Sequence, residues 1–326
     1  MDARITESLR QFLGRQPELK YTFFGGKGGV GKTVFAGAMA LHLAEQGRKV
    51  LLASTNPVHS LSSLLRQDVF GKETQVGTTP LQALEIDTRD TILRKKDEIR
   101  EKIQWFLKYA DLSGQKTEDF VESATMNPAF EESAMFERMV DIMFEDKYDC
   151  YVFDTAPTAN ARRLLGMSKV YTLWVEKMLA SRNEATSLRK TLSFSRKEEK
   201  DPLLDYLLGF RDRIDKVHGL LTDDRLTAFF FVTLPEALPI AVIKRFIGWF
   251  KDFGIPVGGV IVNGLIDRST VTDKTHEFVM NRIASQEKYM EDIFGTLPHV
   301  RAIMPRLDHE IQGVEGLRET FRYIFA

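Results

Sequence analysis

The segment FGGKGGVGKT, at Phe24–Thr33, constrains the fold of this chain more than any other feature. Gly26, Gly31, Lys32 and Thr33 satisfy the pattern G-x-x-x-x-G-K-[ST]. The glycines let backbone N–H groups curl around phosphate oxygens, Lys32 can meet the terminal phosphates, and Thr33 can bind Mg²⁺. A β-favouring run precedes the loop and a helical pattern follows it. We therefore predict the order strand, loop, helix, with a nucleotide bound at the loop.

Short apolar runs recur along the chain and are separated by helical patterns. We predict strands at 21–24, 49–54, 84–87, 148–157, 228–236, 257–264 and 300–305. Continuous apolar runs suit parallel strands that are covered on both faces. The sequence therefore predicts an α/β fold, with a doubly wound and mostly parallel sheet, as one domain over residues 1–326.

Two stretches, 90–147 and 168–224, are far longer than one crossover helix needs. We interpret both as helical insertions that form a subdomain. Apolar residues follow helical spacing in each stretch, including Met135, Met139 and Met143 in the first. In one interpretation these stripes pack on each other and on the sheet. In the other, the methionine-rich helices form an adaptable hydrophobic groove for a partner.

Residues that follow two other predicted strands complete the nucleotide site. Asp154 ends an apolar run and is placed to hold the metal through water. Thr155 and Thr158 follow it, and the stretch STNPVHS at 54–60 also leaves a strand end. We interpret these two segments as switches that a γ-phosphate orders.

Composition argues against several other functions. The formal net charge is -1, from 45 basic and 46 acidic residues, so bulk binding to nucleic acid is not expected. The single cysteine, Cys150, excludes an internal disulfide and an all-thiolate metal site. No run reaches the roughly 18 apolar residues of a membrane span, and the first residues form no apolar signal. We therefore expect a cytoplasmic protein.

These motifs together resemble a known family, the deviant Walker A ATPases of the arsenite-pump-driving (ArsA) and guided-entry-of-tail-anchored-proteins type. The match includes KGGVGKT at Lys27–Thr33, STNPVHS, and FDTAPT at Phe153–Thr158. It implies a SIMIBI-type P-loop fold, ATP hydrolysis, ATP or ADP with Mg²⁺ as ligands, and a homodimer. By this resemblance Lys27 reaches across the dimer interface to the partner's nucleotide. The loop residues implied in nucleotide binding are Gly26, Gly28, Gly29, Val30, Gly31, Lys32, Thr33 and Val34.

Three later segments extend the resemblance. VTLPE, at 232–236, is similar to a segment whose acid meets nucleotide across the interface, which assigns that role to Glu236. VIVNG, at 260–264, implies that Asn263 recognises adenine, since its amide offers both a donor and an acceptor. MPRLDHEIQGVEGL, at 304–317, resembles the family's adenine loop, which Pro305 begins.

The chain departs from the family pattern at two places. It lacks the CxxC motif that shares zinc between subunits, and it lacks the cysteines that bind arsenite. Asn56 stands where the pattern S-T-D-P has an Asp that positions the attacking water. An amide is a far poorer proton acceptor than a carboxylate, so slow hydrolysis is expected. The implied catalytic residues are thus Lys27, Lys32 and Asn56, and the sequence does not separate a natural Asn56 from an engineered one.

The resemblance implies an ATP-switched dimer that binds a hydrophobic client, such as a tail-anchored membrane protein, between the helical insertions. An energy-coupling ATPase of an arsenite or anion exporter is the alternative. A third class, positioning ATPases that work on DNA or membranes, shares the loop with two lysines, but the near-neutral charge argues against it.

Overall fold

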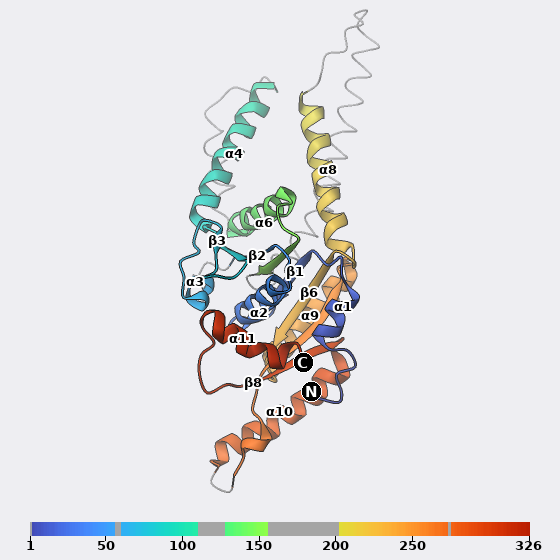
Figure 1. Cartoon of the computed structure of the whole chain (residues 1–326). Helices are drawn as coiled ribbons and strands as arrows, with labels where there is room; N and C mark the ends of the chain where they lie inside the picture. The colour runs from blue at the N-terminus through green and yellow to red at the C-terminus, as the bar shows by residue number, and fades with distance from the viewer. Residues whose placement is uncertain (1, 56–59, 110–127, 156–201, 273–274) are drawn as a thin grey trace, which may run out of the picture.

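One twisted sheet forms the centre of the molecule (Figure 1). The computed structural model describes residues 2–55, 60–109, 128–155, 202–272 and 275–326. Within them the strand order is β3-β4-β2-β5-β1-β6-β7-β8, and every neighbouring pair is parallel except β3 with β4. The strands are β1 (Tyr21–Gly25), β2 (Val50–Ser54), β3 (Thr74–Gln75), β4 (Leu81–Glu85), β5 (Cys150–Asp154), β6 (Thr227–Thr233), β7 (Val257–Leu265) and β8 (Val300–Pro305). The predicted doubly wound, mostly parallel α/β fold is confirmed.

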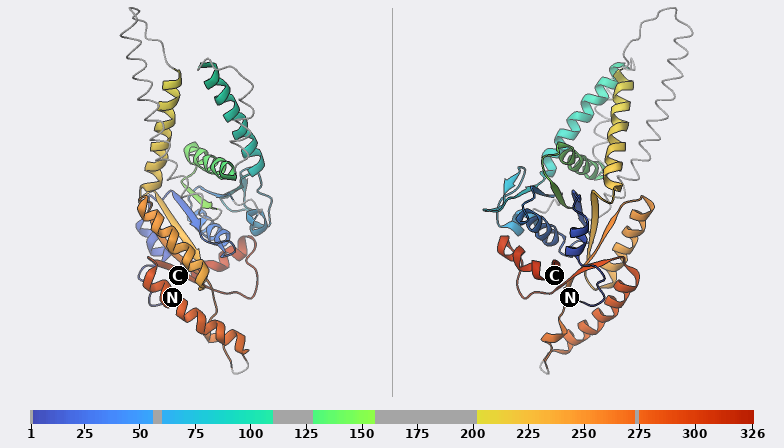
Figure 2. Two further views of the ribbon diagram at one scale, coloured as in Figure 1. Left: turned by 180° about the vertical axis from the view of Figure 1, so that it is seen from behind. Right: turned by 45° about the vertical axis from the view of Figure 1, so that its right-hand side comes forward.

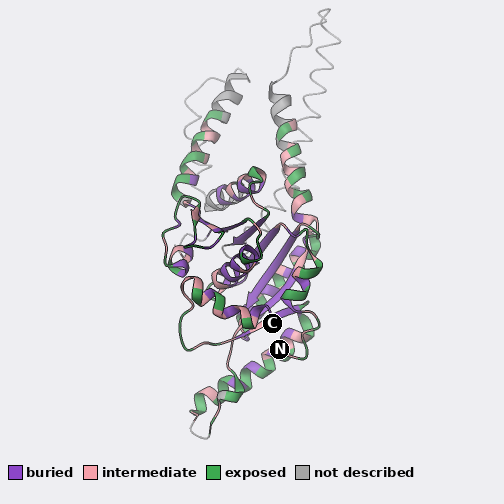
Figure 3. Cartoon of the chain, viewed as in Figure 1, coloured by how far each residue is buried: buried purple, intermediate pink, exposed green. Residues whose placement is uncertain are grey.

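Helices cover both faces of this sheet (Figure 3). The helices are α1 (Leu9–Arg15), α2 (Lys32–Glu45), α3 (Ser60–Leu65), α4 (Thr88–Tyr109), α6 (Pro128–Glu145), α8 (Pro202–Thr222), α9 (Ala237–Asp252), α10 (Glu277–Thr296) and α11 (Gly313–Ile324), with a 3-10 turn η1 (Arg268–Thr270). One buried cluster joins α1, α2, α3 and α11 to the sheet, and a second joins α6, α8, α9 and α10 to its other face. Strands buried on both faces explain the continuous apolar runs of the sequence.

Two details of the sheet differ from the prediction. The strand expected at 84–87 is β4 at Leu81–Glu85, because the half-buried Gln82 interrupts its apolar run. The short antiparallel β3 was not predicted, since two polar residues carry no strand signal. Both differences lie at the β3–β4 edge of the sheet, away from β1 and its loop.

The register of the central strands brings chemically active residues to one edge. β5 lies between β1 and β2, and Asp154 is opposite Phe24 in β1 and Ser54 in β2. Parallel strands expose their carboxyl ends at the same edge, which is where ligands bind in such sheets. The phosphate loop after β1 therefore lies beside Asp154 and the segment after β2.

The predicted insertions contain most of α4 and all of α6 and α8. In the views of Figures 1 and 2, α4 and α8 project to the same end of the molecule, and α10 lies toward the opposite end. The N-terminal part of the second insertion, 168–201, lies outside the described residues. No helix of the described ranges has the length and apolar character that a membrane span needs.

The methionine stripe of α6 belongs to the core. Met135, Met139 and Met143 are 6%, 6% and 2% exposed, and they pack in the cluster that includes Tyr151 and Phe153 of β5. The interpretation in which the stripe packs on the sheet is therefore confirmed. A methionine-lined groove for a partner is wrong for these three residues in this conformation.

Candidate nucleotide site

The phosphate loop connects β1 directly to α2, as predicted. Gly26 has a φ of +145°, and a Cβ atom there would lie 2.4 Å from the carbonyl oxygen of Val232. Gly31, with a φ of +99°, is the N-cap of α2, and a Cβ atom there would lie 2.5 Å from Nδ2 of Asn263. Glycine is required at Gly26 because the backbone of β6 leaves no room for a side chain, and at Gly31 because other residues rarely adopt its positive φ. The loop thus presents its backbone at the N-terminus of a 14-residue helix, which favours phosphate.

Lys32 lies inside this loop and is only 8% exposed. Its ammonium group donates a hydrogen bond to the carbonyl oxygen of Lys27 at 3.2 Å. Burial lowers the pKa of Lys32, and the Asp154 carboxylate opposes that shift. A nucleotide phosphate would give this buried cation a stronger partner than a peptide carbonyl, because the phosphate carries a negative charge and the carbonyl is only a dipole.

Asp154 is the acidic centre of the site and is 1% exposed. Its Oδ2 accepts a hydrogen bond from the hydroxyl of Thr33 at 2.7 Å and one from the hydroxyl of Ser54 at 3.3 Å. Burial raises the pKa of Asp154 to about 6, against the opposing effects of Thr33, Lys32 and Ser54. Among the described residues, its buried Oδ1 has no hydrogen-bond partner.

This arrangement fits a magnesium ion. A carboxylate oxygen with a spare acceptor site, beside a threonine hydroxyl, is the kind of ligand set that Mg²⁺ and its bound water prefer. Thr33 would bind the ion directly and Asp154 would hold its water through the free Oδ1. Bound there with the phosphates, the ion would neutralise charge on the phosphoryl group.

A cavity of about 390 Å³ extends from the phosphate loop along the ends of β6, β7 and β8. It brings together four residues that the sequence predicted, namely Gly29, Glu236, Asn263 and Pro305. The volume falls in the range of small-molecule sites. Its position beside the phosphate loop makes it the candidate site for the base and sugar of the nucleotide.

Asn263 links this cavity to the phosphate loop. Its Nδ2 donates a hydrogen bond to the carbonyl oxygen of Val30 at 2.9 Å. One amide hydrogen is therefore committed to the loop, which leaves the other hydrogen and the oxygen for a base. The interpretation of Asn263 as a base-binding residue remains a proposal, and the structure adds a contact that sequence reasoning did not anticipate.

Three other predicted residues have different surroundings. Glu236 forms an ion pair with Arg282 of α10 at 3.0 Å, and both side chains are nearly half exposed. The Lys27 side chain is partly exposed and makes no hydrogen bond or ion pair with the part of the chain that the structure describes. Asn56 and the second switch beyond Thr155 lie outside the described residues.

Sequence reasoning missed the wall that α10 contributes. Arg282, Ser285, Gln286 and Tyr289 line the cavity on one face of that helix. They follow the spacing of a single helical face. That spacing was the one signal available, but a polar stripe on a helix ordinarily indicates a surface in contact with solvent.

Comparison with known proteins agrees with this geometry. A family model described as anion-transporting ATPase matches residues 19–325. A relative from Aquifex aeolicus, named "Putative arsenical pump-driving ATPase 2", is 30% identical over 309 residues, which is 94% of this chain and 99% of the relative. ATPase GET3A of Arabidopsis thaliana is 29% identical over 98% of this chain and 87% of its own length. ATPase ASNA1 homolog 1 of Paramecium tetraurelia is 28% identical, with 98% and 96% covered. The match over nearly the whole chain, with the phosphate loop at Gly26–Thr33, shows that the chain belongs to the anion-transporting ATPase (ArsA) family and is an ATPase.

Proposed function

We propose that this ATPase is a nucleotide-switched homodimer that binds a hydrophobic client, such as the membrane segment of a tail-anchored protein, between its helical insertions. The observation that carries the proposal is the second lysine of the phosphate loop. Lys32 occupies the position beside Asp154, so Lys27 is not needed there. Its side chain has no hydrogen-bond or ion-pair partner in the described part of its own chain, and it is partly exposed next to the glycines. A second copy of the chain would give it a nucleotide to contact.

The helical insertions are connected to the nucleotide site through the sheet. The methionines of α6 belong to the same buried cluster as Tyr151 and Phe153 of β5, and that strand ends at Asp154. α6 is therefore the packed element between the phosphate end of the sheet and the projecting helices. A change at the ends of β1 and β5 would be transmitted through this buried cluster, since packed cores shift as units.

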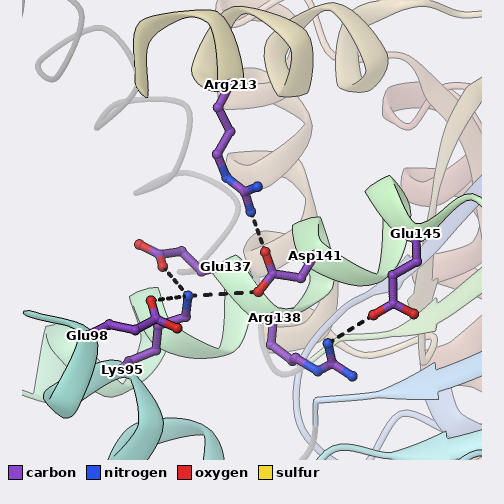
Figure 4. A network of polar contacts seen from close by, with 7 residues as sticks. All are labelled: Lys95, Glu98, Glu137, Arg138, Asp141, Glu145 and Arg213. Atoms are coloured by element: carbon purple, nitrogen blue, oxygen red, sulfur yellow. Dashed lines mark hydrogen bonds and ion pairs between the residues drawn. The ribbon is translucent and has the colours of Figure 1, made fainter. Parts of the chain in front are cut away.

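A network of charged side chains joins α6 to both projecting helices (Figure 4). Lys95 of α4 lies 2.9 Å from a carboxylate oxygen of Glu137 and 3.8 Å from one of Asp141, both on α6. The other oxygen of Asp141 accepts a hydrogen bond from the guanidinium of Arg213 on α8. Burial works against the charge of Lys95, but Glu137, Glu98 and Asp141 outweigh it and raise its pKa. Asp141 thus bridges two helices that are distant in sequence, which supports movement of the three helices together.

The proposal is tested by analytical ultracentrifugation with ADP and with a non-hydrolysable ATP analogue. We expect the analogue with Mg²⁺ to produce a dimer, and a hydrophobic helical peptide to bind to that dimer and not to the ADP form. A polar helical peptide of the same length is the control. A protein that stays monomeric with the analogue, or that binds both peptides equally, would contradict the proposal.

An energy-coupling role for an arsenite exporter is the second candidate, since one relative is named as an arsenical pump-driving ATPase. The chain's single thiol argues against it. Cys150 is buried in β5, and burial raises its pKa to about 11, so the thiol is protonated at neutral pH. Metalloids bind thiolates, and one inaccessible thiol cannot supply the ligands. Arsenite that stimulated the ATPase activity would favour this candidate.

Asn56→Asp is expected to raise kcat by at least about tenfold and to change nucleotide affinity by less than about twofold, because a carboxylate accepts a proton from water far better than an amide. The residue before it is fixed close to the metal-binding acid, since the N–H of Thr55 donates to the carbonyl oxygen of Asp154 at 3.1 Å. Steady-state ATPase assays and nucleotide titrations measure the two effects. Asn281→Asp, at an exposed position of α10, is the matched control. Unchanged turnover in Asn56→Asp would contradict the assigned role.

A further inference from the structure

Gln286, on the cavity face of α10, makes a pair of hydrogen bonds with the backbone of one residue. Its Oε1 accepts from the N–H of Ile266 at 2.9 Å, and its Nε2 donates to the carbonyl oxygen of Ile266 at 2.7 Å. The side chain of Gln286 is buried, and Ile266 also lines the cavity. The amide therefore satisfies both backbone groups of a residue that has left the sheet, which is necessary because buried peptide groups without partners are costly.

Ile266 stands where the walls of the cavity meet. It follows the last residue of β7, the strand that carries Asn263. The carbonyl oxygen of the preceding residue, Leu265, accepts a hydrogen bond from the N–H of Arg306 at 2.8 Å. That bond holds the start of the segment at 305–311, whose residues form another wall. A displacement at Ile266 would thus move the strand end beside Asn263 and the loop after β8 together.

The other polar tie of α10 to this region is weaker. The ion pair between Arg282 and Glu236 is nearly half exposed on both sides, and exposed ion pairs contribute little to rigidity. The Gln286 pair is buried, neutral and bidentate, so it fixes distance and orientation. Asn263 is in turn fixed on the phosphate loop by its bond to Val30.

We propose that Gln286 is a positioning residue that sets the selectivity of the cavity for the nucleobase. It does not touch the reacting atoms. It holds the end of β7 and the loop after β8 at the separation that a bound purine requires. In that arrangement the second amide hydrogen and the amide oxygen of Asn263 face the edge of the base. This inference rests on the assignment of the cavity as the base site, and it is independent of the proposed client.

The test compares Gln286→Leu with the native protein in steady-state kinetics on ATP and GTP. We expect the KM for ATP to rise about tenfold and the preference for ATP over GTP to fall at least about fivefold, with kcat within about twofold, because the variant loses a binding geometry and no catalytic group. Gln67→Leu is a matched control. The amide of Gln67 also makes two hydrogen bonds with backbone groups: it donates to the carbonyl oxygen of Gln75 and accepts from the N–H of Gly77. These bonds lie at the far edge of the sheet.

Gln286→Glu provides a second readout that a merely structural role would not move. A carboxylate can accept from the N–H of Ile266 but cannot donate to its carbonyl oxygen, whereas a protonated carboxyl can do both. Measured relative to the native protein at each pH, the loss of ATP preference in this variant should shrink as pH falls from 8 to 6. This comparison also tests whether Gln286 sets the preference for ATP if the Gln286→Leu variant does not fold.

The proposal is overturned if folded Gln286→Leu keeps the native KM and ATP preference, or if affinity for ATP and GTP falls equally. Asn263→Ala distinguishes the positioning role of Gln286 from the assignment of the cavity as the base site. If it weakens ATP binding and Gln286→Leu does not, the positioning role fails and the base site stands. If neither variant changes nucleotide affinity, the assignment of the cavity fails as well.

Discussion

Asp154→Asn is expected to reduce ATP hydrolysis by at least about 100-fold while leaving the nucleotide-free fold no less stable at pH 7.5. The amide oxygen can still accept the hydrogen bond that Thr33 donates to Asp154. The amide cannot supply the negative charge and the free Oδ1 that the metal site requires. The same substitution therefore removes catalysis and the cost of a buried charge.

The stability half of this prediction follows from the pKa of Asp154. Burial raises that pKa from 3.8 to about 6, so the native state holds this proton more tightly than the unfolded state does. The stabilisation that the protonated group contributes is full below about pH 4 and is lost as pH rises through about 6. Ionisation of the buried carboxyl group costs about 3 kcal/mol at neutral pH, and the variant's gain is smaller than this because Lys32 loses a partner.

Chemical denaturation without nucleotide, at pH 5 and at pH 7.5, measures how much ionised Asp154 lowers the stability of the fold. We expect the free energy of unfolding of Asp154→Asn minus that of the native protein to be larger at pH 7.5 than at pH 5, which means that the variant gains relative stability as pH rises. Mg²⁺ with ATP should raise the Tm of the native protein well above the value with ATP and a chelator, and this difference should vanish in the variant. Asp252→Asn, at an exposed position, controls for loss of one charge. A magnesium-dependent Tm shift that survived in Asp154→Asn would remove Asp154 from the metal site.

The parts of the site that could be predicted from sequence are those fixed by local geometry. The phosphate loop is one continuous segment, in which Gly26 has no room for a side chain beside Val232 and Gly31 adopts a positive φ. The position of Asp154 could be predicted because the carboxyl ends of parallel strands lie at the edge of the sheet where ligands bind. Glu236, Asn263 and Pro305 lie far apart in the chain, but each lies at or just beyond the carboxyl end of one of three adjacent strands, which is why they line one cavity.

The remaining features depend on contacts that leave no mark in a single sequence. Gln286 binds the backbone of Ile266, and a backbone group has no residue identity for a motif to record. The spacing of Met135, Met139 and Met143 predicts burial of one helix face, but not whether the sheet or a partner covers it. Asp141 joins α4 to α8 through residues more than 40 positions away on either side, which no local pattern contains.

Lys27→Ala is expected to leave nucleotide binding to a single chain nearly intact and to abolish the dimer that the ATP analogue induces. Lys32 and the backbone of the loop remain to hold the phosphates, so the Kd for nucleotide should change by less than about threefold. The dimer should weaken by at least about 100-fold, because the variant loses the charge that would meet the partner's phosphates. Sedimentation with the analogue measures this effect, and Lys72→Ala, at an exposed position, is the control. A Lys27→Ala protein that still dimerises with the analogue would contradict the intersubunit role.

A mixture of Lys27→Ala with Asp154→Asn gives the most direct test of which chain the lysine serves. In a mixed dimer, the site on the Lys27→Ala chain keeps its own Asp154 and receives Lys27 from the other chain. If the chains pair at random, half of the dimers are mixed, and one of the two sites in each mixed dimer is competent. The mixture should then regain up to about a quarter of the native activity, provided that Asp154→Asn chains are able to pair. If Lys27 acts only within its own chain, every site in the mixture lacks one essential group, and the activity is the sum of two nearly inactive variants. Restoration would therefore identify a shared site, because no rearrangement within one chain can combine the two intact residues.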